Sequence, residues 1–180
     1  MKYIAFLRGI NVGGNNKISM AELKNAFQNH GFSDVQTYIN SGNLIFSALP
    51  DKEDELKKKC ESVLTDEFNV SVPVAVLSAD DLTESLDNAP SWWNADSESK
   101  HNAIVVISPA QPSEITDAVG GIKPEYENVE CFGKIIFWSA PLKTFSRTKW
   151  SKIVGTPAYE KVTIRNANTM LKLAKMVRQD

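Results

Sequence analysis

An order of strands and helices that occurs twice limits the fold of this chain more than any other feature of its sequence. In each half, apolar periodicity predicts a strand, a helix, two strands joined by a tight turn, a second helix and a final strand. The side chains of the two halves hardly correspond. The βαββαβ order is typical of ferredoxin-like units. The sequence therefore predicts an α+β fold of two tandem ferredoxin-like βαββαβ subdomains plus a C-terminal helix.

Local signals place the individual elements. Ser19 and Glu22 form a capping box that begins the first helix, Gly31 suits its end, and Pro73 argues that the strand it opens lies at a sheet edge. The first half has a strand at 3–7, a helix after Ser19, strands at 35–39 and 44–46, a helix opened by Pro50, and a strand at 72–77. The second half has a strand at 102–107, a helix at 112–119, strands at 129–132 and 135–138, a helix at 146–154, a strand at 161–164, and a helix at 166–177.

These elements divide the 180 residues into an N-terminal subdomain at 1–79, a connecting segment at 80–100 and a C-terminal subdomain at 101–180. The connecting segment contains a short helix and the Trp92–Trp93 pair. Adjacent tryptophans in such a segment are more typical of packing beneath it than of stacking on a ligand. Nothing in the pattern indicates an oligomeric state.

Composition narrows the classes of function. With 42% hydrophobic and 23% charged residues, the chain has the make-up of a soluble globular protein. A net charge of −2 gives no basic field for nucleic acid, and no apolar run approaches the ~18 residues of a membrane span. Cys60 and Cys131 are far apart and no signal-peptide pattern is present, so we predict a cytoplasmic protein with reduced thiols. His30 and His101 lie in no metal-ligand or nucleophile pattern, so we predict no metal site and no cofactor.

Polar loops gather at one end of the first predicted sheet. In a βαββαβ unit the first two strands run in the same direction, so the loop after the first strand and the turn after the second share an end. Arginine binds a carboxylate or phosphate through two hydrogen bonds, asparagine both donates and accepts, and glycine permits close backbone approach. The candidate ligand-binding residues here are Arg8, Asn11, Gly13, Gly14, Asn40, Ser41, Gly42 and Asn43.

In the second half the polar residues collect at the opposite end of the predicted sheet. Ser146 and Asn166 stand where helix N-caps are expected, so helix N-termini would point at an anion there. If the halves pack antiparallel, the two clusters line one cleft between the subdomains. We therefore predict that a small anionic ligand, phosphorylated or carboxylated, binds in this cleft. The candidates in this half are Ser146, Arg147, Lys149, Arg165, Asn166 and Asn168.

Simpler interpretations stay open beside this one. Asn-Gly loops are turn formers first, and Arg147 and Arg165 could instead pair with acids between the halves. Neither a P-loop nor a GxGxxG pattern is present, so no nucleotide motif supports a mechanism. Whether a reaction is catalysed is left open. Ser41 or Ser146 as a nucleophile, or Lys149 as a base, would have to carry it.

Two further functions compete with small-ligand binding. The ferredoxin-like order is shared with RNA-binding RRM modules, whose third strand carries exposed aromatic residues. The first half offers only Phe46, while Phe137 and Trp138 point to opposite faces, so we expect little nucleic-acid binding. A non-catalytic interaction or regulatory subunit would instead use an exposed apolar patch around Trp92 and Trp93.

Three stretches of the sequence resemble the signatures of one bacterial family. They are FLRGINVGG at 6–14, TYINSGN at 37–43 and TIRNANT at 163–169, and SRTK at 146–149 resembles the same family's Ser-rich basic stretch. The family is the widespread domain of unknown function 1697, and the likeness extends over essentially the whole chain. It implies a two-subdomain α+β protein related to the ferredoxin-like arrangement. It implies no established activity, substrate or catalytic residue.

Overall fold

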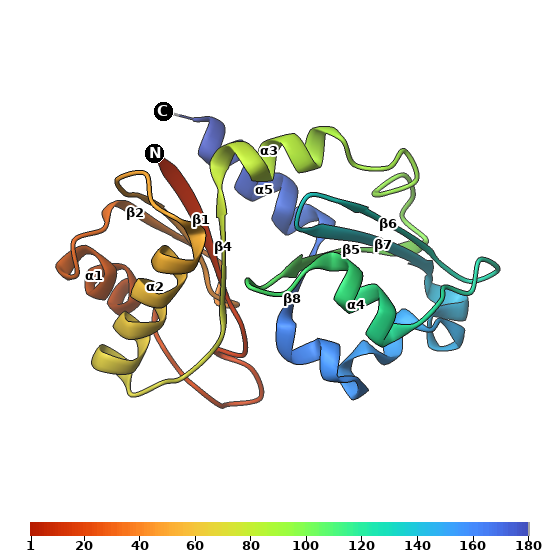
Figure 1. Ribbon diagram of the computed structural model, residues 1–180, viewed down its shortest axis with the longest axis horizontal. Coiled ribbons are helices and arrows are strands. Elements are labelled where there is room, and N and C mark those ends of the chain that lie inside the picture. The colour runs from red at the N-terminus through yellow and green to blue at the C-terminus, as the bar shows by residue number, and fades with distance from the viewer. Residues whose placement is uncertain (180) are drawn as a thin grey trace. The chain divides into compact units, whose positions relative to one another are not determined.

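The computed structural model describes residues 1–179, which form two compact units. The first unit comprises Met1–Leu82 together with the chain from Lys175, and the second comprises Thr83–Ala174. Each unit is built around a four-stranded antiparallel sheet with helices beside it, so the chain is an α+β protein (Figure 1). Among the described residues, no helix is both long enough and apolar enough to cross a membrane.

The first unit orders its strands β2-β3-β1-β4, and its two helices lie on the same face of the sheet (Figure 1). Apolar residues of both helices meet that face, among them Leu23, Phe27, Leu56 and Val63, with Phe68 partly buried against them. These residues form part of the core of the first unit. Its elements are β1 (Lys2–Leu7), α1 (Met20–Asn29), β2 (Ser33–Tyr38), β3 (Asn43–Ser47), α2 (Glu53–Phe68) and β4 (Val74–Ser78).

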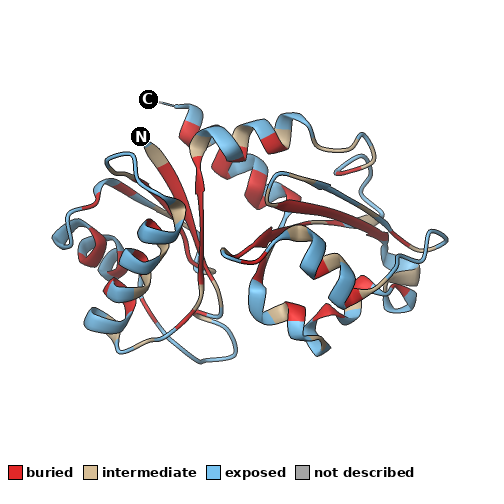
Figure 2. Ribbon diagram, in the orientation of Figure 1, coloured by how far each residue is buried: buried red, intermediate tan, exposed pale blue. Residues whose placement is uncertain are grey.

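The second unit repeats this strand order as β6-β7-β5-β8. Most residues of its two central strands, β5 and β7, are buried, as Figure 2 shows, and Ile104, Ile136 and Trp138 pack there against Ile115 and Ile153. Its strands are β5 (Ser99–Val106), β6 (Asn128–Phe132), β7 (Ile135–Pro141) and β8 (Val162–Asn166), and α4 spans Pro112–Val119. Two helices have residues in both units, α3 (Ala79–Asp87) and α5 (Ala167–Arg178).

Several local predictions are confirmed. Ser19 is the N-cap of α1 and accepts the backbone N–H of Glu22 at 3.1 Å, while its hydroxyl donates to the Glu22 carboxylate at 2.8 Å. Gly31 follows the end of this helix with φ of +87°, a conformation that glycine adopts without strain. Pro73 precedes β4, which is an edge strand of its sheet.

The predicted helix at 146–154 is wrong. The segment between β7 and β8 forms three short 3-10 helices, η1 (Leu142–Arg147), η2 (Trp150–Gly155) and η3 (Pro157–Lys161). The buried carboxylate of Glu127 accepts the backbone N–H groups of Lys149 and Trp150, at 2.8 and 3.1 Å. Because a side chain binds these N–H groups, they are not available to a continuous helix. Ser146 lies inside η1, so it is not the expected N-cap.

Candidate functional site

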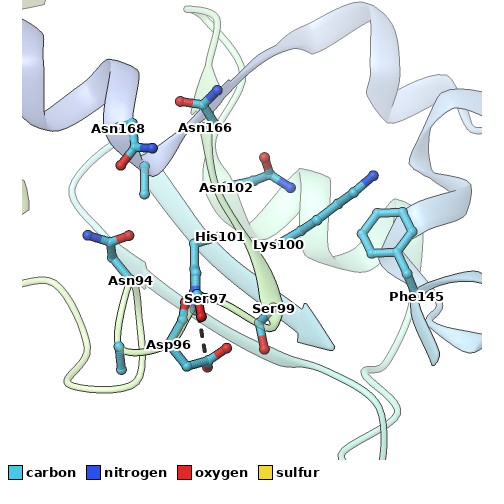
Figure 3. Close-up of a pocket in the computed structure, with 12 residues that line it drawn as sticks. Asn94, Asp96, Ser97, Ser99, Lys100, His101, Asn102, Phe145, Asn166 and Asn168 are labelled. Carbon is cyan, nitrogen blue, oxygen red and sulfur yellow. Dashed lines mark hydrogen bonds and ion pairs between the residues drawn. The ribbon is translucent and has the colours of Figure 1, made fainter. Parts of the chain in front are cut away.

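A hollow of ≈ 850 Å³ lies in the second unit, at the end of the sheet where β5 begins and β8 ends (Figure 3). Three separate segments form its walls: residues 94–102, η1, and the junction between β8 and α5. Most of the side chains are polar, and four of them are asparagines. We call it the asparagine hollow. The residues used below are Asn94, Asp96, Lys100, His101, Asn102, Phe145, Asn166 and Asn168.

The antiparallel register explains why these distant segments meet. Asn102 at the start of β5 pairs with Asn166 at the end of β8. Trp93 then holds the incoming loop, because its indole N–H donates to the Asn102 carbonyl at 2.9 Å. Its ring meets Phe137 edge-on, with the centroids 5.0 Å apart. Trp93 is buried and Trp92 half-buried, so the prediction that this pair packs is confirmed for Trp93.

His101 is a positioning residue in the floor of the hollow. Its Nε2 lies 2.8 Å from the backbone carbonyl of Asp96, and because a carbonyl only accepts, Nε2 must carry the proton. In the neutral ring Nδ1 then accepts from the Ser139 hydroxyl, 2.6 Å away. The Asp96 carboxylate lies 3.7 Å from Nε2, as the dashed line in Figure 3 indicates. Both ring nitrogens are therefore engaged in holding the 94–102 segment to the sheet.

The hollow contains both a cation and an anion. Lys100 is exposed, and its ammonium lies 4.3 Å from the ring centroid of Phe145, a cation–π contact that steadies the side chain. Desolvation opposes ionisation of Asp96, but hydrogen bonds from Ser99 and from the backbone N–H groups of Glu98 and Ser99 outweigh it. They hold the pKa of the Asp96 carboxyl below its ordinary value. The site thus offers one positive and one negative group.

The first turn of α5 also lies at the hollow. Asn166 caps this helix, because its side-chain oxygen accepts the backbone N–H of Thr169 at 2.8 Å. This confirms the N-cap expected at Asn166. Asn168 follows in the first turn, exposed and lining the hollow. The helix N-terminus carries a partial positive charge, so this wall favours an anionic group.

The other basic candidates of this unit are not among the described residues that line the hollow. The guanidinium of Arg147 lies over the Tyr126 ring, 5.8 Å from its centroid. The ammonium of Lys149 lies against Gly120, 2.9 Å from the position that a Cβ would take there. Ser146 is exposed within η1. The structure therefore groups Asn166 and Asn168 and separates this basic stretch from them.

Arg165 has a structural role in β8. It is 8% exposed, and its guanidinium donates to the Thr163 hydroxyl at 2.8 Å and to the Ile164 carbonyl at 3.0 Å. Burial lowers the pKa of Arg165 to about 10. A buried cation is costly unless it is bonded, so these contacts belong to the fold of the strand. A role for Arg165 in ligand binding stays a prediction.

In the first unit, the structure brings the two predicted loops together. The Leu7 N–H donates to the Gly42 carbonyl at 2.8 Å, and the Asn11 side-chain amide donates to the Asn40 carbonyl at 2.9 Å. The same amide also donates to the Ile18 carbonyl and its oxygen accepts the Ile18 N–H, both at 2.9 Å. Asn11 therefore builds the loop with its own side chain.

Two neighbouring candidates, Gly42 and Asn43, have similar structural roles. Asn43 is buried and donates to the Tyr38 carbonyl at 2.9 Å and to the Ser41 hydroxyl at 3.2 Å. A Cβ at Gly42 would lie 2.6 Å from the side chain of Ile10, so only glycine fits there. For Gly42 and Asn43, the interpretation that they form the turn is therefore well supported. The remaining candidates are the half-buried Arg8 at the end of β1 and the exposed Gly13 and Gly14.

A smaller hollow, of ≈ 440 Å³, lies beside these loops and the start of α1. Of the predicted residues, Asn11, Gly14 and Asn40 line it, together with Lys17 and Ser19. Its polar groups are largely engaged in building the loop, as the bonds of Asn11 show. A ligand role for this group stays a prediction.

The sequence reasoning missed Asn94, Asp96, Lys100, His101 and Asn102. They were assigned to a polar connecting segment and to the start of a strand, without a binding role. The signal that could have found them is the fold itself, because the first and fourth strands of a βαββαβ unit are antiparallel neighbours. The start of β5 therefore had to lie beside 166–168. Among the described residues, no group of three or more His, Cys, Asp and Glu side chains could hold a metal ion.

Comparisons with known proteins agree with this architecture. The family described as "Protein of unknown function (DUF1697)" matches residues 1–137. A solved structure of a conserved bacterial protein from Streptococcus pneumoniae is 31% identical in sequence, with a TM-score of 0.87, and the match covers 97% of each chain. No curated protein matches the chain. The chain therefore belongs to the DUF1697 family of proteins of unknown function.

Proposed function

We propose that the second unit binds a small anionic ligand, phosphorylated or carboxylated, in the asparagine hollow. The observation that carries the proposal is the convergence of four asparagine side chains and Lys100 on one hollow of ≈ 850 Å³. Three separate chain segments supply these groups, and His101 and Trp93 fix the segment that holds most of them. A few oriented polar groups in a preformed hollow are typical of small-molecule sites.

Each group has a place in such binding. The Lys100 ammonium and the N-terminus of α5 favour the anionic part of the ligand. The amides of Asn102 and Asn168 both donate and accept, so they read the hydrogen-bonding pattern of the remainder. The ionised Asp96 accepts hydrogen bonds from hydroxyl or amino groups. The ligand that fits is therefore a small polar metabolite that carries both an anionic group and hydrogen-bond donors.

The alternatives have less support. RNA binding of the RRM type needs exposed aromatic rings, whereas Phe46, Phe137 and Trp138 are all buried. The burial of Trp93 argues against an exposed interaction surface around the tryptophan pair. We propose binding without assigning a catalytic residue, because His101 is held by Ser139 and by a carbonyl.

Two variants that change the charge of the hollow test whether it binds an anion, and the first removes a positive charge. In ¹⁵N NMR titrations with inorganic phosphate and with citrate, we expect saturable shifts at the backbone N–H of Asn168 and at the side-chain amide of Asn102. Lys100→Met keeps the stem of the side chain and removes its charge, so the affinity should fall by about tenfold. The matched control is Lys152→Met, an exposed lysine of η2 outside the hollow, which should bind as the wild type does.

The second variant separates binding from stability. Asn168→Asp places a negative charge in the first turn of α5, which should raise stability by about 0.3–1 kcal/mol while it repels the anion. Ser113→Asp places the same charge in the first turn of α4, away from the hollow, and should leave the titration unchanged. Absence of saturable shifts with both anions, or equal losses in Asn168→Asp and Ser113→Asp, would contradict the proposal.

Three broader expectations accompany this one. We infer that each unit derives from a ferredoxin-like arrangement, which is supported by the strand orders β2-β3-β1-β4 and β6-β7-β5-β8. The free thiols of Cys60 and Cys131 suit the expected cytoplasmic location. The prediction that residues of both halves share one cleft stays a prediction.

A further inference from the structure

Three of the four asparagine side chains that line the asparagine hollow are not used by the fold. Asn166 caps α5 with its side-chain oxygen. The side chains of Asn94, Asn102 and Asn168, by contrast, form no hydrogen bond within residues 1–179. Each of these carboxamides offers N–H donors and a carbonyl acceptor side by side. The hollow is therefore suited to a ligand group that also has a donor and an acceptor next to each other.

Two opposite charges stand apart in the same hollow. Figure 3 shows the Lys100 ammonium beside the Phe145 ring, and the Asp96 carboxylate away from it, near His101. The Asp96 side chain is 50% exposed, and one of its oxygens accepts the Glu98 N–H at 2.9 Å. A carboxylate has about four acceptor positions, so Asp96 can accept a further donor. A ligand with one positive and one negative group would match both charges.

The aromatic ring of the hollow argues against a nucleotide. A nucleobase gains much of its binding energy by stacking on the face of an aromatic side chain. The Phe145 ring already has the Lys100 ammonium 4.3 Å from its centroid and the Trp138 ring at a centroid distance of 5.2 Å. Hydrogen bonds and charges, rather than stacking, would therefore select the ligand.

A short peptide combines the three features in one molecule. It carries an ammonium and a carboxylate, and between them a peptide group with one N–H donor and one carbonyl acceptor. We propose, on the basis of the anion binding proposed above, that the asparagine hollow binds a di- or tripeptide with free termini. The carboxylate binds at Lys100 and the ammonium at Asp96. The peptide group bonds to the carboxamide of Asn102 and to those of its neighbours in the hollow.

A series of small ligands tests each of these contacts. In ¹⁵N NMR titrations followed at the backbone N–H of Asn168 and the side-chain amide of Asn102, glycylglycine should bind at least about tenfold more tightly than acetate. N-acetylglycylglycine lacks the ammonium, glycylglycinamide lacks the carboxylate, and 5-aminopentanoate has two methylene groups in place of the peptide group. Each should bind about tenfold more weakly than glycylglycine, because each loses one kind of contact.

A charge variant separates peptide binding from anion binding alone. Asp96→Asn keeps an acceptor oxygen for the Glu98 N–H and removes the negative charge. Glycylglycine should then bind about tenfold more weakly, whereas phosphate should bind more tightly because a repelling charge is gone. Misfolding of the segment would weaken both. The matched control is Asp117→Asn, an exposed acid of α4 outside the hollow, which should change neither titration.

The possible failures can be told apart. If phosphate and citrate bind saturably but glycylglycine binds no better than acetate, the anion site stands and the peptide proposal is wrong. Equal binding of N-acetylglycylglycine and glycylglycine would show that Asp96 binds no ammonium, and would assign the hollow to the C-terminus of a longer chain. Tighter binding of AMP than of glycylglycine would assign it to nucleotides. If none of these ligands moves either signal, both proposals fail.

Discussion

The two units have the same strand order but join their third and fourth strands in different ways. In the first unit the connection is α2, a helix of 16 residues. In the second it is the run of η1, η2 and η3. Both connections bury apolar side chains against their own sheet, including Leu56 of α2 and Ile153 of η2. The comparison teaches that the same place in a sheet can be covered without regular helix, provided that the backbone polar groups are satisfied in another way.

The two connections differ in how they satisfy those groups. A helix bonds its own N–H groups, and α2 needs outside partners only at its ends. In the second unit the Glu127 carboxylate accepts the N–H groups of Lys123, Lys149 and Trp150, at 2.8–3.1 Å, and the Trp138 indole N–H at 3.2 Å. Glu127 therefore binds the N–H groups around the start of η2, and backbone bonds within the 3-10 helices, such as that from the Thr148 N–H to the Phe145 carbonyl, bind others.

The largest expected effect is at this carboxylate. Glu127 is 2% exposed, and Glu127→Gln replaces one acceptor oxygen by a donor that faces other donors. We expect the free energy of unfolding to fall by roughly 3–5 kcal/mol, because a buried hydrogen-bond network loses its centre. Urea unfolding followed by tryptophan fluorescence measures it.

The matched control in the first unit is Glu61→Gln. The Glu61 carboxylate accepts only one backbone N–H among those described, that of Val74 at 3.2 Å, and it is half-buried. Its loss should cost about 1 kcal/mol. Equal costs at Glu61 and Glu127 would show that the second connection does not depend on its buried carboxylate.

The next prediction concerns burial in the two connections. Leu56→Ala in α2 and Ile153→Ala in η2 should each lower the free energy of unfolding by roughly 2–5 kcal/mol, because both side chains are buried and each deletion leaves a cavity. Similar costs would show that the two connections contribute alike to their cores. A much smaller cost at Ile153, below that of an exposed control such as Val154→Ala, would show that the 3-10 segment packs only loosely.

This contrast also explains how far the sequence predicted the fold. Leu56, Cys60, Val63 and Leu64 recur at helical spacing, so α2 was visible from its own residues. The segment from 146 to 154 has apolar residues that a helix would also accommodate. Its conformation depends instead on Glu127, a residue distant in sequence, and a local pattern cannot show that contact.

The candidate site was predicted in part for a related reason. Topology alone indicated that the loops around Asn11 and Asn40 meet, and that Asn166 begins a helix. The part played by Lys100 and His101 depended on cross-strand register, which places Asn102 against Asn166 and His101 against Ser139. Side-chain type identified the polar residues, but only the register selects those that share a hollow.

The smallest expected loss of stability comes from removing either of two helix N-caps, one in each unit. Ser19 caps α1 in the first unit and Asn166 caps α5 from the second, each through one bond to a backbone N–H. Ser19→Ala and Asn166→Ala should each cost about 1 kcal/mol of stability. Only Asn166→Ala should also weaken phosphate binding, because only Asn166 lines the asparagine hollow.

A conservative variant separates capping from ligand contact. Asn166→Ser keeps an N-cap oxygen and removes the amide, so stability should stay near that of the wild type while phosphate binding still falls. If Asn166→Ser restores both stability and binding, the amide makes no contact with the ligand, and Asn166 acts in the hollow only through the helix that it begins. If both cap variants leave phosphate binding unchanged, the anion does not lie at the start of α5, and the asymmetry proposed between the two units is wrong.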